Sequence, residues 1–227
     1  MTRHSHTPAS LDTLIRRHEA SWLAYCRHDF VRQLAAGALP AAAFRHYLKQ
    51  DYLFLIHFAR AWGLAVYKSR DIGELRQGCD SLKAIVDLEM QLHVDYCRQW
   101  GIPETELAEL PEATQTMAYT RYVLDAGLRG DLLDLHVALA PCLIGYADIA
   151  LWLRDQPFTV QGAGNPYASW LDMYAGEEFQ AAADQERRWL DARLAEQSPR
   201  RLDELARLFH DATRLEIDFW QMGLDAA

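Results

Sequence analysis

Apolar side chains recur at intervals of three and four residues through most of the chain, which is the spacing of one face of a helix. Gly and Pro are sparse, and they separate long segments rich in Ala, Leu, Glu, Arg and Gln, residues that favour helix. No alternating run of β-branched residues is long enough to predict a strand. The pattern predicts helices over residues 10–36, 41–68, 74–100, 111–127, 131–154, 165–175, 177–196 and 199–222.

The connections between these segments are short, which favours neighbouring helices that run antiparallel in a bundle. The longest irregular piece, RDQPFTVQGAGNPY, is typical of a surface loop. Residues 1–9 are expected to form a flexible N-terminal tail. A chain of 227 residues suits one large domain, so we expect an all-α fold with a single helical domain over residues 10–227.

Three predicted helices carry a titratable side chain within their apolar face. These side chains are Asp51, Cys142 and Glu216, and each continues the helical spacing of the apolar residues around it. The surrounding stripes are Phe44, Leu48, Leu55, Phe58 and Trp62; Leu135, Leu139, Tyr146, Ile149 and Leu153; and Leu205, Phe209, Ala212 and Phe219. A thiol and two carboxyl groups that face one bundle interior can supply a nucleophile, a hydrogen-bond acceptor and a general acid.

Each of these three residues also has a structural interpretation. A single Cys in an apolar stripe is commonly an inert small hydrophobic residue. Asp51 can form an ion pair with Arg or Lys from another helix, and Arg207 or Arg214 is close enough in sequence to pair with Glu216. The coincidence of all three in apolar faces favours a functional site, but it does not identify a substrate.

Pro141 directly precedes Cys142 inside a helical pattern. Proline lacks a backbone N–H and its ring collides with the preceding turn. We therefore expect a kink just before Cys142, with a backbone carbonyl left free near the thiol. A kink that only serves packing of the bundle is the alternative.

Composition narrows the classes of partner and compartment. The net charge of −9, without a basic stripe, argues against nucleic-acid binding. No segment has the roughly 20 uninterrupted apolar residues of a membrane helix, so no membrane association is expected. The N-terminus lacks the apolar region of a secretion signal, so we expect a cytoplasmic protein whose four cysteines are free thiols.

The motifs of metal, haem and nucleotide sites are absent from the sequence. A di-iron bundle needs carboxylates from four helices with paired Glu-x-x-His motifs, whereas Glu89 and His93, four residues apart, give one pair of ligands at most. His18 lies in the charged segment IRRHEA, which is typical of a surface position rather than of a haem ligand. P-loop, GxGxxG and GxSxG motifs do not occur. No metal or organic cofactor is expected.

Four segments, in order along the chain, resemble the TenA/thiaminase II family. FRHYLKQDYLFLIHFARAW is similar to the family's segment around its substrate-binding aspartate, and ALAPCLIGYADIA to the segment of its cysteine nucleophile. NPYASWLDMYAGEEF resembles its downstream aromatic segment, and LEIDFW its C-terminal Glu-x-x-Phe-Trp. The resemblance covers residues 10–222, and the cysteine places the chain with the cysteine-containing branch.

The resemblance implies a haem-oxygenase-like helical bundle that works without a cofactor and assembles as a homotetramer. It implies hydrolysis of thiamin, or of its degradation product aminomethyl-aminopyrimidine, to hydroxymethylpyrimidine in thiamin salvage. By position, Cys142 would be the nucleophile, Glu216 the proton donor and Asp51 the anchor of the aminopyrimidine. The substrate would further be bound or enclosed by Tyr146, Tyr174, Phe54, Tyr119, His93 and Phe219.

The chain departs from the family pattern at three positions. Asn165 precedes Pro166 where His is frequent, Phe54 stands where Tyr is common, and Leu215 stands where an aromatic residue is frequent. The loss of the Phe54 hydroxyl is expected to change substrate contacts, whereas Asn165 is expected to concern only its loop.

Two other functions are compatible with the same fold. One is a cofactor-free oxidase that resembles pyrroloquinoline-quinone synthase, for which a large pocket lined by His and Arg is expected. The other is a non-catalytic regulator or binding protein, which would bind an aminopyrimidine without turnover. The acidic charge and the lack of a helix-turn-helix pattern argue against direct DNA binding.

Overall fold

The computed structural model describes residues 8–227, and this part of the chain contains helices, turns and loops but no strand. The elements, in chain order, are α1 (Leu11–Arg17), α2 (Glu19–Cys26), α3 (Asp29–Ala35), α4 (Ala41–Lys68), α5 (Ile72–Ala84), η1 (Ile85–Glu89), α6 (Met90–Gln99), α7 (Glu104–Leu107), α8 (Thr114–Arg129), α9 (Leu132–Ala140), η2 (Pro141–Gly145), α10 (Tyr146–Arg154), η3 (Gly162–Gly164), α11 (Ala168–Ala175), α12 (Glu177–Leu194) and α13 (Pro199–Asp225). Segments η1 and η2 are π-helical, and η3 is a 3-10 turn. The predicted all-α fold is confirmed.

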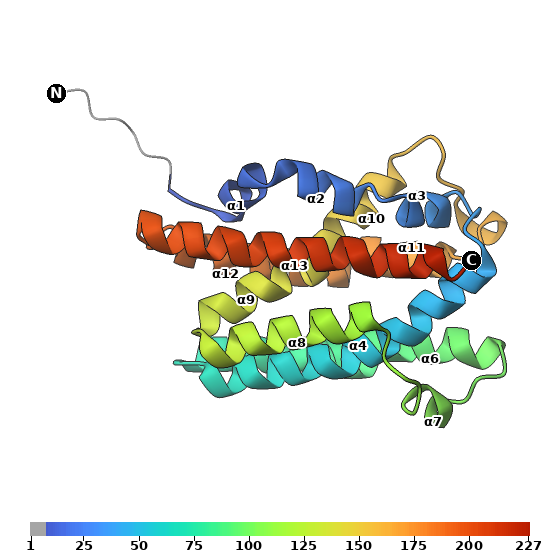
Figure 1. Ribbon diagram of the computed structural model, residues 1–227, viewed down its shortest axis with the longest axis horizontal. Helices are drawn as coiled ribbons and strands as arrows, with labels where there is room; N and C mark the ends of the chain where they lie inside the picture. The colour runs from blue at the N-terminus through green and yellow to red at the C-terminus, as the bar shows by residue number, and fades with distance from the viewer. Residues whose placement is uncertain (1–7) are drawn as a thin grey trace.

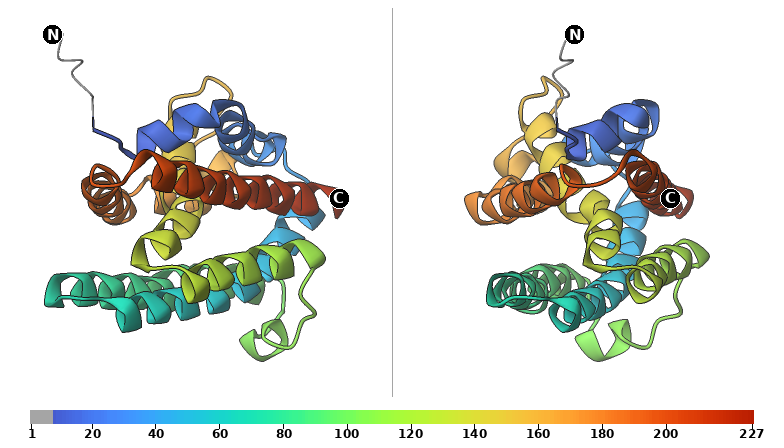
Figure 2. Two further views of the ribbon diagram at one scale, coloured as in Figure 1. Left: turned by 60° about the vertical axis from the view of Figure 1, so that its left-hand side comes forward. Right: turned by 90° about the vertical axis from the view of Figure 1, so that its left-hand side faces the viewer.

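The long helix α13 runs through the middle of the bundle (Figure 1). It packs against α2 and α3 on one side and against α4 and α8 on the other. Helix α9 crosses between these two groups and contacts α4, α8, α12 and α13, as the turned views in Figure 2 show. The three helices that carry Asp51, Cys142 and Glu216 therefore meet in the interior of the bundle.

The continuous segment α9–η2–α10 is the most apolar part of the chain. It covers Leu132–Arg154 and is, by length and composition, apolar enough to cross a membrane. In the bundle, 78% of its most apolar 18-residue window is buried. The core helix of a globular bundle has the same character, because burial on all sides removes the need for a polar face.

Several predicted boundaries agree with the structure, and others need correction. The predicted 41–68 is α4 with the same bounds, and 177–196 and 199–222 correspond closely to α12 and α13. The predicted helix 10–36 is wrong as a single helix, because the chain breaks at His18 and again at Arg27 to form α1, α2 and α3. The short α7 was not predicted. The tail expected over residues 1–9 lies largely outside the described residues.

The expected kink at Pro141 takes a specific form. Pro141 begins the π-helical segment η2, in which the backbone is wider than in an α-helix. The hydroxyl of the buried Tyr25 donates a hydrogen bond to the carbonyl oxygen of Pro141 at 3.0 Å. The sequence thus located the interruption of the α-helix at Pro141, and the structure shows that Tyr25 from α2 hydrogen-bonds to the π-helical segment there.

Candidate functional site

Asp51 lies in α4 with its carboxylate surrounded by polar groups in an otherwise apolar interior. Its Oδ2 accepts a hydrogen bond from the Tyr47 hydroxyl at 2.8 Å, and Nε2 of His93 lies 2.7 Å away. The other nitrogen of His93, Nδ1, lies 2.8 Å from the backbone oxygen of Glu89. Asp51 and His93 are both buried, and Asp51 pairs with His93 rather than with the Arg or Lys of the alternative structural interpretation.

Glu216 lies in α13 and is also buried. Its Oε1 accepts a hydrogen bond from the Tyr119 hydroxyl of α8 at 2.9 Å. Burial raises the pKa of Glu216 well above its usual range, the Tyr119 hydrogen bond opposes this, and the nearby charge of Asp51 adds to it. The carboxyl group therefore favours its protonated form, and the alternative pairing with Arg207 or Arg214 does not occur.

Cys142 is the second residue of η2 and its side chain is buried. Burial raises the pKa of its thiol well above the usual value, and the negative charges of Glu216, Glu89 and Asp51 raise it further. The three carboxyl groups are therefore all part of the electrostatic surroundings of the sulfur. The thiol is protonated near neutral pH, so any nucleophilic step first needs an acceptor for its proton.

Glu89 is a member of this group that the sequence analysis did not assign to the site. It is the last residue of η1, and its Oε1 accepts a hydrogen bond from the Tyr174 hydroxyl at 2.8 Å. Burial and the charge of Asp51 raise its pKa to about 7, against the opposing effects of His93 and Tyr174. The sequence drew attention to Glu89 only as one of two potential metal ligands.

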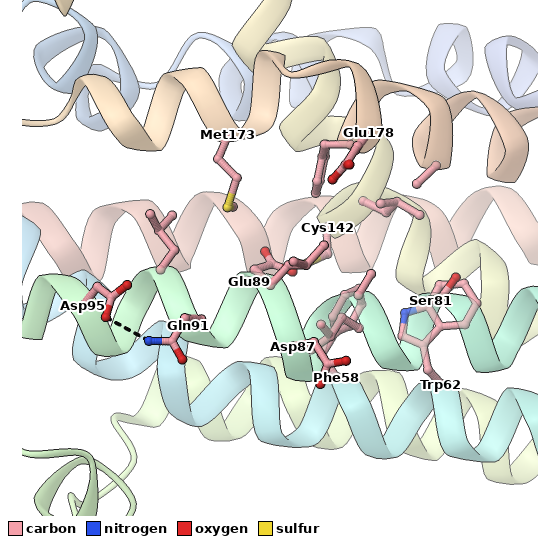
Figure 3. Close-up of a pocket in the computed structure, with 17 residues that line it drawn as sticks. Phe58, Trp62, Ser81, Asp87, Glu89, Gln91, Asp95, Cys142, Met173 and Glu178 are labelled. Atoms are coloured by element: carbon pink, nitrogen blue, oxygen red, sulfur yellow. Dashed lines mark hydrogen bonds between the residues drawn. The ribbon is translucent and has the colours of Figure 1, made fainter.

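A cavity of about 440 Å³ opens beside these groups. Figure 3 shows Glu89 and Cys142 at its centre, with Phe58 and Trp62 from α4 farther along the wall and Met173 from α11 opposite. Leu88 and Phe179 belong to the lining as well. The walls are mainly apolar and aromatic, which is typical of a site for a flat small molecule.

Aromatic side chains enclose the carboxyl groups behind this cavity. Phe54 lies 4.9 Å from Tyr119 and 5.7 Å from Phe219 between ring centroids. Tyr146 and Tyr174 are 4.9 Å apart, and the Tyr146 hydroxyl lies 3.5 Å from that of Tyr47. These rings come from five different helices, so the tertiary fold brings them together rather than any local segment.

The structure thus places all nine sequence-predicted site residues in the buried interior. Cys142 is the one among them that lines the cavity, and the other eight are buried outside its lining. Asp51 contacts His93, and Glu216 contacts Tyr119. Their roles toward a substrate stay predictions, since contact among them does not show what they bind.

The structural data also bear on the metal, haem and disulfide interpretations. Among residues 8–227, no group of three or more His, Cys, Asp or Glu side chains is placed to hold a metal ion. His18 is partly exposed and stacks on His210 with ring centroids 4.1 Å apart. All four cysteines fall in this part of the chain, and none forms a disulfide.

Comparison with known proteins identifies the family. A model described as the TENA/THI-4/PQQC family matches residues 15–226. A Haemophilus influenzae protein, named only "Uncharacterized protein", is 44% identical over 217 residues, covering 96% of this chain and 100% of that protein. An aminopyrimidine aminohydrolase from Halalkalibacterium halodurans is 34% identical over 213 residues, covering 93% of each chain.

A solved structure gives the same assignment. A protein from a Silicibacter species, described as a TenA family transcription regulator, superposes with a TM-score of 0.84 at 42% identity. The superposition covers 96% of this chain and 97% of the other. From its sequence motifs, its fold and these relatives, the chain belongs to the TENA/THI-4/PQQC family.

Proposed function

We propose that this protein hydrolyses an aminopyrimidine in thiamin salvage, converting aminomethyl-aminopyrimidine or thiamin to hydroxymethylpyrimidine. The observation that carries the proposal is the Cys142 thiol on the wall of an apolar cavity, with Glu89 in the same lining and the buried Asp51 and Glu216 behind it. The relative from Halalkalibacterium halodurans, named an aminopyrimidine aminohydrolase, supports the same reaction class. The reaction replaces an amine by the hydroxyl group of water at the exocyclic carbon.

Two buried carboxyl groups suit the two polar edges of an aminopyrimidine. Asp51, paired with His93, can accept a charge-assisted hydrogen bond from the amino group on the ring. Glu216 favours its protonated form and can give a proton to a ring nitrogen. Different hydrogen-bond partners thus suit the two carboxyl groups to different roles in one interior.

Protonation of the ring makes covalent catalysis by Cys142 possible. A proton from Glu216 withdraws electrons from the ring, so that the thiolate of Cys142 adds to the adjacent ring carbon. The lone pair of the ring amino group then expels the exocyclic amine, and water adds at the exocyclic carbon. Loss of the sulfur and return of the ring proton to Glu216 restore the aromatic ring and release the hydroxymethyl product.

One alternative enzyme is not favoured by the cavity. A cofactor-free oxidase resembling pyrroloquinoline-quinone synthase was expected to have a pocket lined by His and Arg. Within the described residues, the cavity lining contains no His, Arg or Lys and includes Asp87, Glu89, Asp95 and Glu178. An acidic and apolar lining fits a neutral or cationic heterocycle better than a polyanionic quinone precursor.

The test is turnover with defined substrates and a matched pair of cysteine variants. The purified protein would be incubated with aminomethyl-aminopyrimidine and with thiamin, and hydroxymethylpyrimidine would be quantified. Cys142→Ser is expected to abolish product, whereas Cys79→Ser, at an exposed cysteine, should retain the wild-type rate. A folded wild-type protein without product from either substrate would remove the proposal. Binding of the pyrimidine without turnover would then indicate a non-catalytic binding protein.

A further inference from the structure

The proposed chemistry leaves the proton of the Cys142 thiol without an acceptor. The thiol is buried and its pKa is raised well above the usual value, by burial first and then by Glu216, Glu89 and Asp51. The thiolate therefore does not form by simple equilibration with solvent near neutral pH. A base that lies within the cavity has to remove this proton.

Two of the three nearby carboxyl groups are already engaged. Asp51 accepts from Tyr47 and pairs with His93, and it faces the proposed position of the ring amino group. Glu216 accepts from Tyr119, and its own proton is needed by the ring nitrogen. Neither group lines the cavity beside the sulfur.

Glu89 differs from both of these carboxyl groups in position. It lines the same cavity as Cys142, and Figure 3 shows the two side chains next to each other in the cavity, Glu89 from η1 and Cys142 from η2. Its Oε1 is fixed by the Tyr174 hydroxyl at 2.8 Å, which leaves Oε2 without that restraint. Each residue belongs to a π-helical segment, a type of distortion that is frequent at functional sites.

We propose that Glu89 is the proton-transfer residue of this site, taking the proton of Cys142 and passing it to the departing amine. This inference rests on the proposed hydrolysis of an aminopyrimidine. It assigns to Glu89 a catalytic role separate from those of Asp51 and Glu216.

The protons balance through one cycle. Glu89 begins as a carboxylate, takes the S–H proton as the sulfur–carbon bond forms, and gives this proton to the exocyclic amine, which leaves as ammonia. Water then adds its hydroxyl to the exocyclic carbon and its proton to Glu89. When the sulfur–carbon bond breaks, Glu89 returns this proton to the sulfur and is again a carboxylate. The net change is the exchange of ammonia for water.

The surroundings of Glu89 suit both directions of transfer. Burial and Asp51 raise its pKa to about 7, so carboxylate and carboxylic acid are both populated near neutral pH. General acid–base catalysis is most efficient when the pKa of the group lies near the working pH.

The deciding experiment compares wild type, Glu89→Gln and Glu177→Gln over pH 5.5–9, with both substrates. The amide of Glu89→Gln keeps an oxygen that can accept from Tyr174, and Glu177 is an exposed carboxylate of α12 outside the cavity lining. The wild-type kcat/KM should rise with pH through an apparent pKa near 7. Glu89→Gln should lose this rise and about 10²–10⁴-fold in kcat/KM, the usual contribution of a general acid–base group. Glu177→Gln should keep the wild-type kcat/KM and its rise with pH.

The two substrates separate proton transfer from a structural role. The amine needs a proton to leave, whereas the thiazolium of thiamin leaves as a neutral thiazole without one. Glu89→Gln should therefore lose more activity toward aminomethyl-aminopyrimidine than toward thiamin. Formate, a small carboxylate that can enter the cavity, should restore part of the activity of Glu89→Ala.

The outcomes distinguish this inference from the proposed function. Suppose that the wild type is active and Cys142→Ser is inactive, but Glu89→Gln keeps the wild-type rate and pH profile. This result would overturn only the role of Glu89 and leave the proposed function standing. Equal losses on both substrates without formate rescue would assign Glu89 a structural role and also overturn the inference. An inactive wild type would remove both proposals together.

Discussion

Nε2 of His93 lies 2.7 Å from Oδ2 of Asp51, and both side chains are buried. The other ring nitrogen, Nδ1, faces the backbone oxygen of Glu89 at 2.8 Å, and because a carbonyl only accepts, Nδ1 carries a hydrogen. A hydrogen on Nε2 as well would let the same ring donate to Oδ2 of Asp51, so this geometry suits a positively charged imidazolium at His93. Burial opposes this charge on His93, but Asp51 outweighs it and the pKa of His93 is raised.

The ion pair predicts a stability effect that depends on pH. His93→Gln removes the charged partner of the buried Asp51 and should lower the free energy of unfolding by about 3–5 kcal/mol. Because the pKa of His93 is raised in the folded protein, its contribution is complete below pH 6.5 and is lost as pH rises through the raised value. The difference in free energy of unfolding between wild type and His93→Gln, measured with urea, should be larger at pH 6 than at pH 9. The partly exposed His46, changed to Gln, serves as the control, and equal differences at both pH values would argue against an ion pair.

Glu89 should lower stability above neutral pH. Its pKa is raised from 4.5 to about 7, so the folded state holds a proton that the unfolded state releases, and stability falls as pH rises through this interval. Glu89→Gln lacks this ionisation and should be more stable than wild type at pH 8.5, by on the order of 2 kcal/mol after allowing for solvent screening of a partly exposed group. The two proteins should differ less at pH 5.5. Thermal unfolding at the two pH values measures this, and a variant that is less stable at pH 8.5 would contradict it.

The proton donor role of Glu216 leads to a prediction about rate without loss of fold. Glu216→Gln can still accept the hydrogen bond from Tyr119, but it cannot supply a proton to a ring nitrogen. We expect kcat/KM for hydroxymethylpyrimidine formation to fall by about 10²–10⁴-fold, with thermal unfolding close to that of wild type. Asp218→Asn, an exposed position on the same helix, is the matched control and should retain activity. Wild-type kinetics in Glu216→Gln would assign the donor role elsewhere.

The apolar stripes of the predicted helices indicated where the site lies, because burial leaves a clear pattern in the sequence. Asp51, Cys142 and Glu216 each continue an apolar stripe, and in the structure all three are buried together with the stripes that contain them. The pairing of Asp51 with His93 was not predictable from the same pattern. It depends on how α4 and α6 are positioned relative to each other, which a one-dimensional periodicity does not contain.

Glu89 was not assigned to the site because no apolar stripe was identified in the helix predicted over 74–100. The sequence predicts one regular helix there, whereas η1 interrupts it at Ile85–Glu89. A π-helical turn contains an extra residue, so side chains before and after it do not share one α-helical face. Pro141 gave a signal for η2, but η1 contains no Pro or Gly. The breaks at His18 and Arg27 likewise lack a Gly or Pro and follow from packing in the folded chain.

Gly145 should be essential to the geometry of η2. A Cβ atom at this position would collide with Cε1 of Tyr25, whose hydroxyl donates to the carbonyl oxygen of Pro141. Gly145→Ala should therefore displace Tyr25, cost about 1–3 kcal/mol of stability and lower the activity that depends on Cys142. Gly63→Ala, in the interior of α4, meets no atom within 4 Å and should stabilise by about 0.5–1 kcal/mol. Chemical unfolding measures the stability of both variants. A Gly145→Ala variant as stable as Gly63→Ala would show that the observed position of Tyr25 is not needed for stability.

Asn165 has a structural role in the loop that precedes α11. Its buried Nδ2 lies 3.0–3.1 Å from the carbonyl oxygens of Leu34, Ala35 and Val160. Its Oδ1 accepts a hydrogen bond from the backbone N–H of Tyr167 at 2.9 Å. One amide side chain therefore joins the loop to the C-terminal end of α3.

Loss of this amide should destabilise the protein, because it leaves buried backbone groups without partners. Asn165→Ala is expected to lower the free energy of unfolding by about 2–3 kcal/mol. Gln161→Ala, at an exposed position of the same loop, should change it by no more than about 0.5 kcal/mol. Urea unfolding of the two variants makes the comparison, with limited proteolysis to locate cleavage in the loop. If Asn165→Ala were as stable as Gln161→Ala, the backbone bond from Val160 N–H to the oxygen of Ala35 would be sufficient to hold the loop.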